Sequence, residues 1–181
     1  LSAFYFDIRK DSLYCDTKDS KRRKSCIAVL NIILDSLIKW FAPILSFTTE
    51  EIFRLISKDK KSIHLEKFIK FPKSFENEGL NKKWVELKKI RDICNISIEA
   101  KRASKEIGSS LEANLTIFLN EKLFKITENV DFSEICITSA VKIEKTKLDE
   151  VSAQTKKALG EKCPVCWKIN KNGCDRHPIK F

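Results

Sequence analysis

Residues 20–41 read SKRRKSCIAVLNIILDSLIKWF and carry the strongest helical pattern of the chain. Its apolar side chains recur at helical spacing, at Ile27, Leu30, Ile33, Leu34, Leu37, Ile38 and Phe41. Asp19 or Ser20 is a suitable N-cap, and Pro43 cannot continue a helix. The stretch predicts a helix over about 20–42 and a mainly α fold.

Two further helices are expected on either side of an irregular, Lys-rich segment at 58–79. Thr48-Thr-Glu-Glu51 has the form of a capping box and predicts a short helix over about 48–57. Residues 80–107 predict a long helix that ends at Gly108, with one apolar side made of Trp84, Leu87, Ile90, Cys94 and Ile98. Residues 1–19 indicate a helix end and a loop packed on a core.

The pattern changes after Gly108. Residues 112–119 place Ala113, Leu115, Ile117 and Leu119 on one face, which is typical of a strand. A short helix near 121–128 and a second strand near 134–143 would complete a small β-α-β-like unit. Residues 144–160 are rich in Lys, Glu, Asp and Ser, and we expect a linker there.

The end of the sequence holds two matching pairs, Cys163-Pro-Val-Cys166 and Cys174-Asp-Arg-His177. Two ligands separated by two residues occupy one tight turn, and two such turns supply the four ligands of a tetrahedral zinc ion. Only seven residues separate the pairs, so this ribbon cannot bury a core of its own, and the metal must stabilise it. The pairs predict one structural Zn²⁺ on Cys163, Cys166, Cys174 and His177.

Other interpretations of these cysteines are weaker. If these were ordinary thiols and an ordinary histidine, their matching spacing would be a rare coincidence. A catalytic zinc would need an open coordination position, and here four protein ligands fill all of them. A redox pair at Cys163 and Cys166 leaves the second pair unexplained. The other cysteines, Cys15, Cys26, Cys94 and Cys136, are expected to be small buried hydrophobes. An odd total of seven without regular spacing argues against disulfides and for a reducing cytoplasm.

The formal net charge is +10, and half of it lies in the last 31 residues. Such an excess favours a polyanionic partner, RNA or DNA first, although Lys-rich genome composition would produce it too. The sequence has no Gly-rich phosphate loop, Ser/His/Asp set or carboxylate cluster, and no apolar run long enough for a membrane span. It has no Met and begins at Leu1, so we expect a fragment or processed piece.

Several segments resemble isoleucyl-tRNA synthetases, in the order of that family. They are Leu1-Ser-Ala-Phe-Tyr-Phe-Asp-Ile-Arg-Lys-Asp-Ser-Leu-Tyr-Cys15, Trp40-Phe-Ala-Pro-Ile-Leu-Ser-Phe-Thr-Thr-Glu-Glu51, Ile107-Gly-Ser-Ser-Leu-Glu-Ala113 and the Cys-Pro-x-Cys-Trp ending at 163–167. The second is similar to a stretch shared with the valyl and leucyl enzymes. One departure is His177, where the family more often has Cys.

The resemblance implies an anticodon-binding helical domain at 1–108, a small α/β junction unit at 109–155 and a zinc-binding ribbon at 156–181. It also implies a cytoplasmic, monomeric parent class I enzyme that ligates isoleucine to its tRNA with ATP. The His-Ile-Gly-His and Lys-Met-Ser-Lys-Ser type signatures of its nucleotide-binding fold are absent. We therefore expect a non-catalytic piece whose partners are the anticodon stem-loop of tRNA(Ile) and the catalytic body of the same polypeptide.

Proteins read splayed anticodon bases by stacking aromatic or guanidinium planes on them. Trp167 lies among basic residues and is the first candidate, with packing of the ribbon as its alternative role. The other candidates are Lys168, Lys171, Arg176, Arg91 and Arg102. A free-standing zinc-ribbon RNA-binding or scaffold protein is the alternative function, and the coding sequence upstream of Leu1 would decide between the two.

Overall fold

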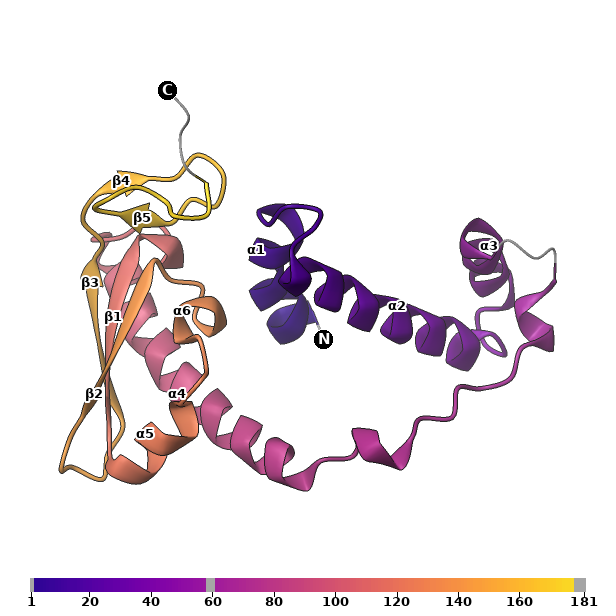
Figure 1. The fold of residues 1–181 in the computed structure, drawn as a ribbon, viewed down its shortest axis with the longest axis horizontal. Helices are drawn as coiled ribbons and strands as arrows, with labels where there is room; N and C mark the ends of the chain where they lie inside the picture. The colour runs from indigo at the N-terminus through magenta and orange to yellow at the C-terminus, as the bar shows by residue number, and fades with distance from the viewer. Residues whose placement is uncertain (1, 58–60, 178–181) are drawn as a thin grey trace. The chain divides into compact units, whose positions relative to one another are not determined.

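The computed structural model describes residues 2–57 and 61–177 (Figure 1). Leu1 of the first resembling segment, residues 58–60 of the Lys-rich loop and residues 178–181 of the expected ribbon lie outside the described residues. The chain forms two compact units. We call Asp16–Glu76 the helical unit, and Leu1–Cys15 with Asn77–Phe181 the mixed unit, and we describe each by itself.

The helical unit contains α2 (Lys21–Phe41), α3 (Ser46–Ile56) and two 3-10 turns, Ile63–Leu65 and Lys73–Phe75. The predicted helix at 20–42 is confirmed as α2. Its N-cap is Ser20, whose hydroxyl accepts a hydrogen bond from the backbone N–H of Arg23. A small core of Ile38, Ala42, Phe53 and Ile63 joins the two helices to the first turn.

The predicted capping box of α3 is wrong. The helix begins two residues earlier than expected, at Ser46. Its N-cap is Leu45, whose apolar side chain cannot accept a capping hydrogen bond. Thr49 therefore lies inside the first turn, where its hydroxyl donates to the Leu45 carbonyl at 2.9 Å. Glu50 does not cap the helix. Its carboxylate accepts hydrogen bonds from the Ser62 hydroxyl and the Ile63 N–H.

The mixed unit begins with a π-helical turn, Ser2–Phe6, and α1 (Asp7–Tyr14), and resumes with α4 (Glu78–Ala103). The apolar side predicted for α4 is confirmed, with Leu87, Ile90, Cys94 and Ile98 buried. The helix does not reach Gly108. It ends at Ala103 because Lys105 adopts a left-handed φ of 60°, which breaks the helical ladder.

A three-stranded sheet packs against α4 in the order β2-β1-β3, as Figure 1 shows. Its strands are β1 (Ala113–Leu119), β2 (Ala140–Lys145), parallel to β1, and β3 (Ser152–Lys157), antiparallel to β1. The predicted buried face of β1 is confirmed, because Ala113, Leu115, Ile117 and Leu119 are each at most 2% exposed. The short 3-10 turn Ser110–Glu112 leads into this strand.

Two predictions after β1 need correction. The helix near 121–128 exists as α5 (Glu121–Thr127), but the strand near 134–143 starts only at Ala140. The apolar residues before it form α6 (Phe132–Ile135) and a turn in which Ile137 has a φ of 55°. The expected linker at 144–160 also contains β3, a polar edge strand with Thr155 as its one buried residue.

A two-stranded ribbon follows, with β4 (Glu161–Lys162) antiparallel to β5 (Ile169–Asn170). Gly160 precedes it with a φ of 129°, and a Cβ there would lie 2.3 Å from the Asn170 carbonyl oxygen, so only glycine fits. Among the described residues, no helix is long and apolar enough to cross a membrane. The mainly α fold class with a small mixed sheet is confirmed.

Candidate metal centre

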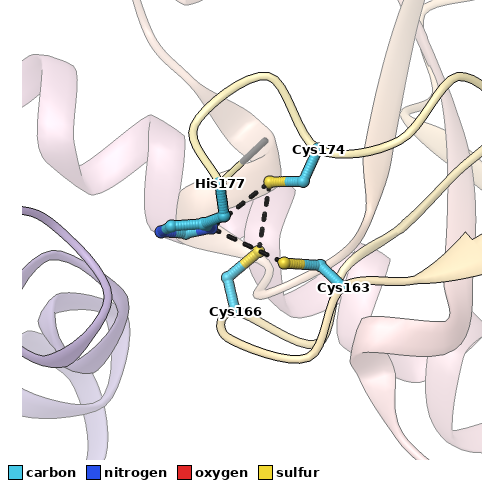
Figure 2. A group of neighbouring side chains, drawn as sticks. All are labelled: Cys163, Cys166, Cys174 and His177. Atoms are coloured by element: carbon cyan, nitrogen blue, oxygen red, sulfur yellow. Dashed lines mark hydrogen bonds between the residues drawn. The ribbon is translucent and has the colours of Figure 1, made fainter. Parts of the chain in front are cut away.

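The four predicted ligands come together at the tip of this ribbon. Their sulfur and ring nitrogen atoms all lie within 4.8 Å of one another, and Figure 2 shows the side chains converging from two loops. In the first loop, the backbone N–H of Trp167 donates to the Cys163 carbonyl at 3.0 Å. In the second, the N–H of His177 donates to the Cys174 carbonyl at 3.1 Å. Each pair therefore occupies one tight turn, as the spacing predicts.

The distances between the ligands fit a tetrahedral ion of the size of zinc. Bonds of about 2.3 Å to sulfur and about 2.0 Å to nitrogen would separate two sulfurs by about 3.8 Å, and a sulfur from the nitrogen by about 3.5 Å. The sulfurs of Cys166 and Cys174 are 3.7 Å apart. Nδ1 of His177 lies 3.6 Å from the Cys163 sulfur and 3.3 Å from that of Cys174. The cluster can hold a metal ion in its centre.

The two thiols of the first loop differ in acidity. Burial raises the pKa of Cys163, but the backbone N–H groups of Cys166 and Val165 and the side chains of Cys166 and His177 together lower it to about 6. Burial and the neighbouring sulfurs raise the pKa of Cys166 to about 11. The charge of a bound ion would favour the thiolate form of all three cysteines.

The cluster is also hydrogen-bonded to α1. His177 Nε2 lies 2.7 Å from the carbonyl oxygen of Cys15, and Arg176 forms two hydrogen bonds with Asp11. The sequence predicted Cys15 as a buried hydrophobe, but it is only half-buried, whereas Cys26, Cys94 and Cys136 are buried as expected. No sequence signal near Asp11 or Cys15 pointed to the metal centre.

The RNA-contact candidates of the ribbon differ in their surroundings. Trp167 is 59% exposed, and the Nζ atom of Lys162 lies 5.7 Å from its ring centroid. Lys171 is exposed. Lys168 is half-buried and donates to the Ser133 hydroxyl at 3.2 Å, so it contacts α6.

The two candidates on α4 have protein partners. Arg91 donates from Nε to the Ile135 carbonyl at 2.9 Å, and its guanidinium lies 5.4 Å from the ring centroid of Phe4. Arg102 is exposed and pairs with Glu99 at 2.7 Å. The structure does not bring either residue into the group around the four predicted ligands.

A largely apolar cavity of about 350 Å³ separates α1 from the first ligand loop. Ile8 and Tyr14 line it from α1, and Val165 and Trp167 line it from the ribbon. Trp167 is therefore exposed to solvent and also lines the cavity, on the side opposite α1.

The family of anticodon-binding domains of tRNA ligases matches residues 1–117, and the chain belongs to this family. Individual relatives are isoleucine–tRNA ligases. The chain is 72% identical over 177 residues to the isoleucine–tRNA ligase of Pelagibacter ubique, which covers 98% of this chain and 20% of the relative. The isoleucine–tRNA ligases of Bartonella henselae and Agrobacterium fabrum are 40% and 39% identical, over 95% and 93% of this chain and 19% of each relative.

The resemblance to isoleucyl-tRNA synthetases is thereby confirmed. The chain spans about a fifth of the length of these relatives.

Proposed function

We propose that this chain is the tRNA-binding part of an isoleucine–tRNA ligase and that it contacts the anticodon stem-loop of tRNA(Ile). The observation that carries the proposal is the exposed indole of Trp167, directly after the metal ligand Cys166, in a chain of the anticodon-binding family. A rigid metal turn would present this ring at low entropic cost, and stacking on an aromatic ring suits the unpaired bases of an anticodon loop.

The metal is proposed to be a single structural Zn²⁺. Three sulfurs and one imidazole nitrogen are the donor set that zinc prefers, and four protein ligands leave no position for a reacting water. The segments 1–108, 109–155 and 156–181 are proposed as the anticodon-binding, junction and zinc-binding parts of this tRNA-binding chain.

The basic residues would supply phosphate contacts around Trp167. Lys171 is exposed and Lys168 lies at the edge of the cavity. Arg176, Arg91 and Arg102 each have a protein partner, so a phosphate contact by any of them would share or replace that partner. Formation of isoleucyl-tRNA with ATP is proposed for the catalytic body of the whole enzyme, a cytoplasmic monomer.

Competition binding tests the proposal. The zinc-loaded chain would be titrated into a fluorescent anticodon stem-loop of tRNA(Ile), then challenged with the unlabelled loop or with the same stem closed by an unrelated loop. We expect the native loop to compete at lower concentration, because bases as well as phosphates are contacted. Equal competition would mean that the chain binds RNA by charge alone, and the proposal would be wrong.

A further inference from the structure

The two ring nitrogens of His177 face different partners. Nδ1 faces the sulfurs of Cys163 and Cys174, whereas Nε2 lies 2.7 Å from the carbonyl oxygen of Cys15. A carbonyl oxygen can only accept a hydrogen bond, so Nε2 must bear the hydrogen. In a neutral imidazole this leaves the lone pair on Nδ1, which is the nitrogen turned toward the metal position.

Cys15 is the C-cap of α1, and its backbone N–H donates to the Asp11 carbonyl at 2.9 Å. The last carbonyl groups of a helix have no partner within the helix. His177 supplies one for Cys15 from 162 positions further along the chain. The ribbon thus completes the end of α1.

Two more hydrogen-bonding contacts join the same elements. Arg176 donates to both carboxylate oxygens of Asp11, and the Cys15 thiol lies 3.6 Å from the carbonyl oxygen of Val165. Residues from both ligand loops therefore contact the last turn of α1. Between them, these contacts hold together two walls of the cavity of about 350 Å³.

The second ligand loop has little else to keep His177 in place, although the first loop and β5 are anchored through Lys168 to Ser133 and through the Ile169 N–H to Ser139. The strands of the ribbon are two residues each, and in the described part of the second ligand loop, residues 171–177, no side chain is fully buried. A bound metal would fix the imidazole at Nδ1 and so aim Nε2 at Cys15. We propose that metal binding latches the ribbon onto the C-terminal end of α1 through His177, with Arg176 as the supporting contact. The inference rests on the proposed metal binding and is independent of RNA binding.

The decisive variant is His177→Cys, because a thiolate is also a good zinc ligand but has no second nitrogen for Cys15. Zinc content would be measured by elemental analysis, and backbone amide exchange by mass spectrometry over residues 7–15. We expect one zinc per chain and an exchange rate in this segment that rises roughly two- to tenfold, as for the loss of one hydrogen bond. Asn172→Ala, an exposed change between the ligand loops, is the control and should leave exchange at 7–15 unchanged.

If His177→Cys retains zinc and residues 7–15 exchange at the parent rate, His177 is a ligand only and the latch is wrong. If His177→Cys loses zinc, the latch is tested on the parent chain instead, by comparing its amide exchange with and without zinc. Removing zinc with a chelator must then increase exchange at 7–15 together with that of 161–177. Loosening of the ribbon alone would overturn the proposal, as would nitrogen NMR of the zinc-loaded chain that placed the metal on Nε2 of His177.

Discussion

Asp11 accepts two hydrogen bonds from the guanidinium of Arg176, each 2.8 Å long, across 165 positions of sequence. The pair is only partly exposed, at 21% for the Asp11 side chain and 34% for that of Arg176. Two parallel charge-assisted bonds restrict the guanidinium in a way that a single contact does not. The relationship connects α1 to the ribbon independently of the metal ligands themselves.

A double-mutant cycle with Asp11→Asn and Arg176→Lys should therefore show coupling. We expect roughly 0.5–1 kcal/mol in the unfolding free energy of the zinc-loaded chain, at the upper end for a partly exposed pair. The control cycle uses Asp7 and Lys10, a more exposed pair within α1, and should give a smaller coupling because solvent screens it. Coupling no larger than in the control would show that the bidentate geometry contributes nothing.

Loss of one predicted metal ligand should unfold the ribbon, loosen the end of α1 and spare the core around β1. Cys163→Ser removes a thiolate from a segment with almost no core, whereas the core around Leu115 and Ile117 is built from other elements. Zinc content should fall to zero, and amide exchange should become fast over 161–177 but not over 113–119. Cys26→Ser, the same change at a buried site of the helical unit, should keep its zinc. Full zinc in Cys163→Ser would contradict the assigned ligand set.

The centre of β1 should dominate the stability of the mixed unit. Ile117 is 0% exposed and pairs with Ile143 and Ala153 on either side. Ile117→Ala should cost about 2–5 kcal/mol of unfolding free energy, measured by urea denaturation. Thr116→Ala, next to it on the opposite face, should cost less than about 1 kcal/mol. Equal costs for the two would mean that the face of β1 has been assigned incorrectly.

The parts predictable from the sequence were those with a local signal. The spacing of Cys163 and Cys166 indicates a pair of metal ligands, and the alternation of apolar and polar residues over β1 indicates a strand. β3 was missed because an edge strand that turns only Ala153 and Thr155 toward the core shows little hydrophobic pattern.

The contacts between α1 and the ribbon could not be predicted for a different reason. Asp11 and Cys15 meet Arg176 and His177 only through the tertiary fold, and the partners are separated by 162 to 165 positions. Neither hydrophobic periodicity nor residue spacing in the sequence indicates that these distant residues are in contact. The early end of α4 has a similar cause, since the left-handed Lys105 is not a residue type that marks a helix end.

At acidic pH, the 3-10 turn Ile63–Leu65 should lose its hydrogen bonds to Glu50 of α3. Glu50 accepts hydrogen bonds from the Ser62 hydroxyl at 2.8 Å and the Ile63 N–H at 2.9 Å, and these lower its pKa below the ordinary 4.5. A carboxyl whose pKa is depressed by folding stabilises the fold above its unfolded pKa, and this contribution is lost as pH falls through the folded pKa. NMR titration should therefore show Glu50 and the Ile63 amide changing together below pH 4.5.

The matched variant is Glu50→Gln, in which the Ile63 amide should lose this acid transition. A Glu50 carboxyl that titrates at or above its ordinary value would contradict the hydrogen bonds assigned to it. The test concerns the helical unit alone, because Ile63 packs on Ile38 and Phe53.

The most direct test of RNA recognition by the metal ribbon is a salt titration of anticodon stem-loop affinity for Trp167→Ala and Lys171→Ala, with zinc content checked in each. We predict that Trp167→Ala keeps its zinc, loses about 1–3 kcal/mol of binding free energy and retains the parent salt slope, because stacking releases no counterions. Lys171→Ala should instead reduce the slope by about one unit. If Trp167→Ala retains its zinc and binds with the parent affinity at every salt concentration, the indole is a packing residue and the ribbon does not read the anticodon through it.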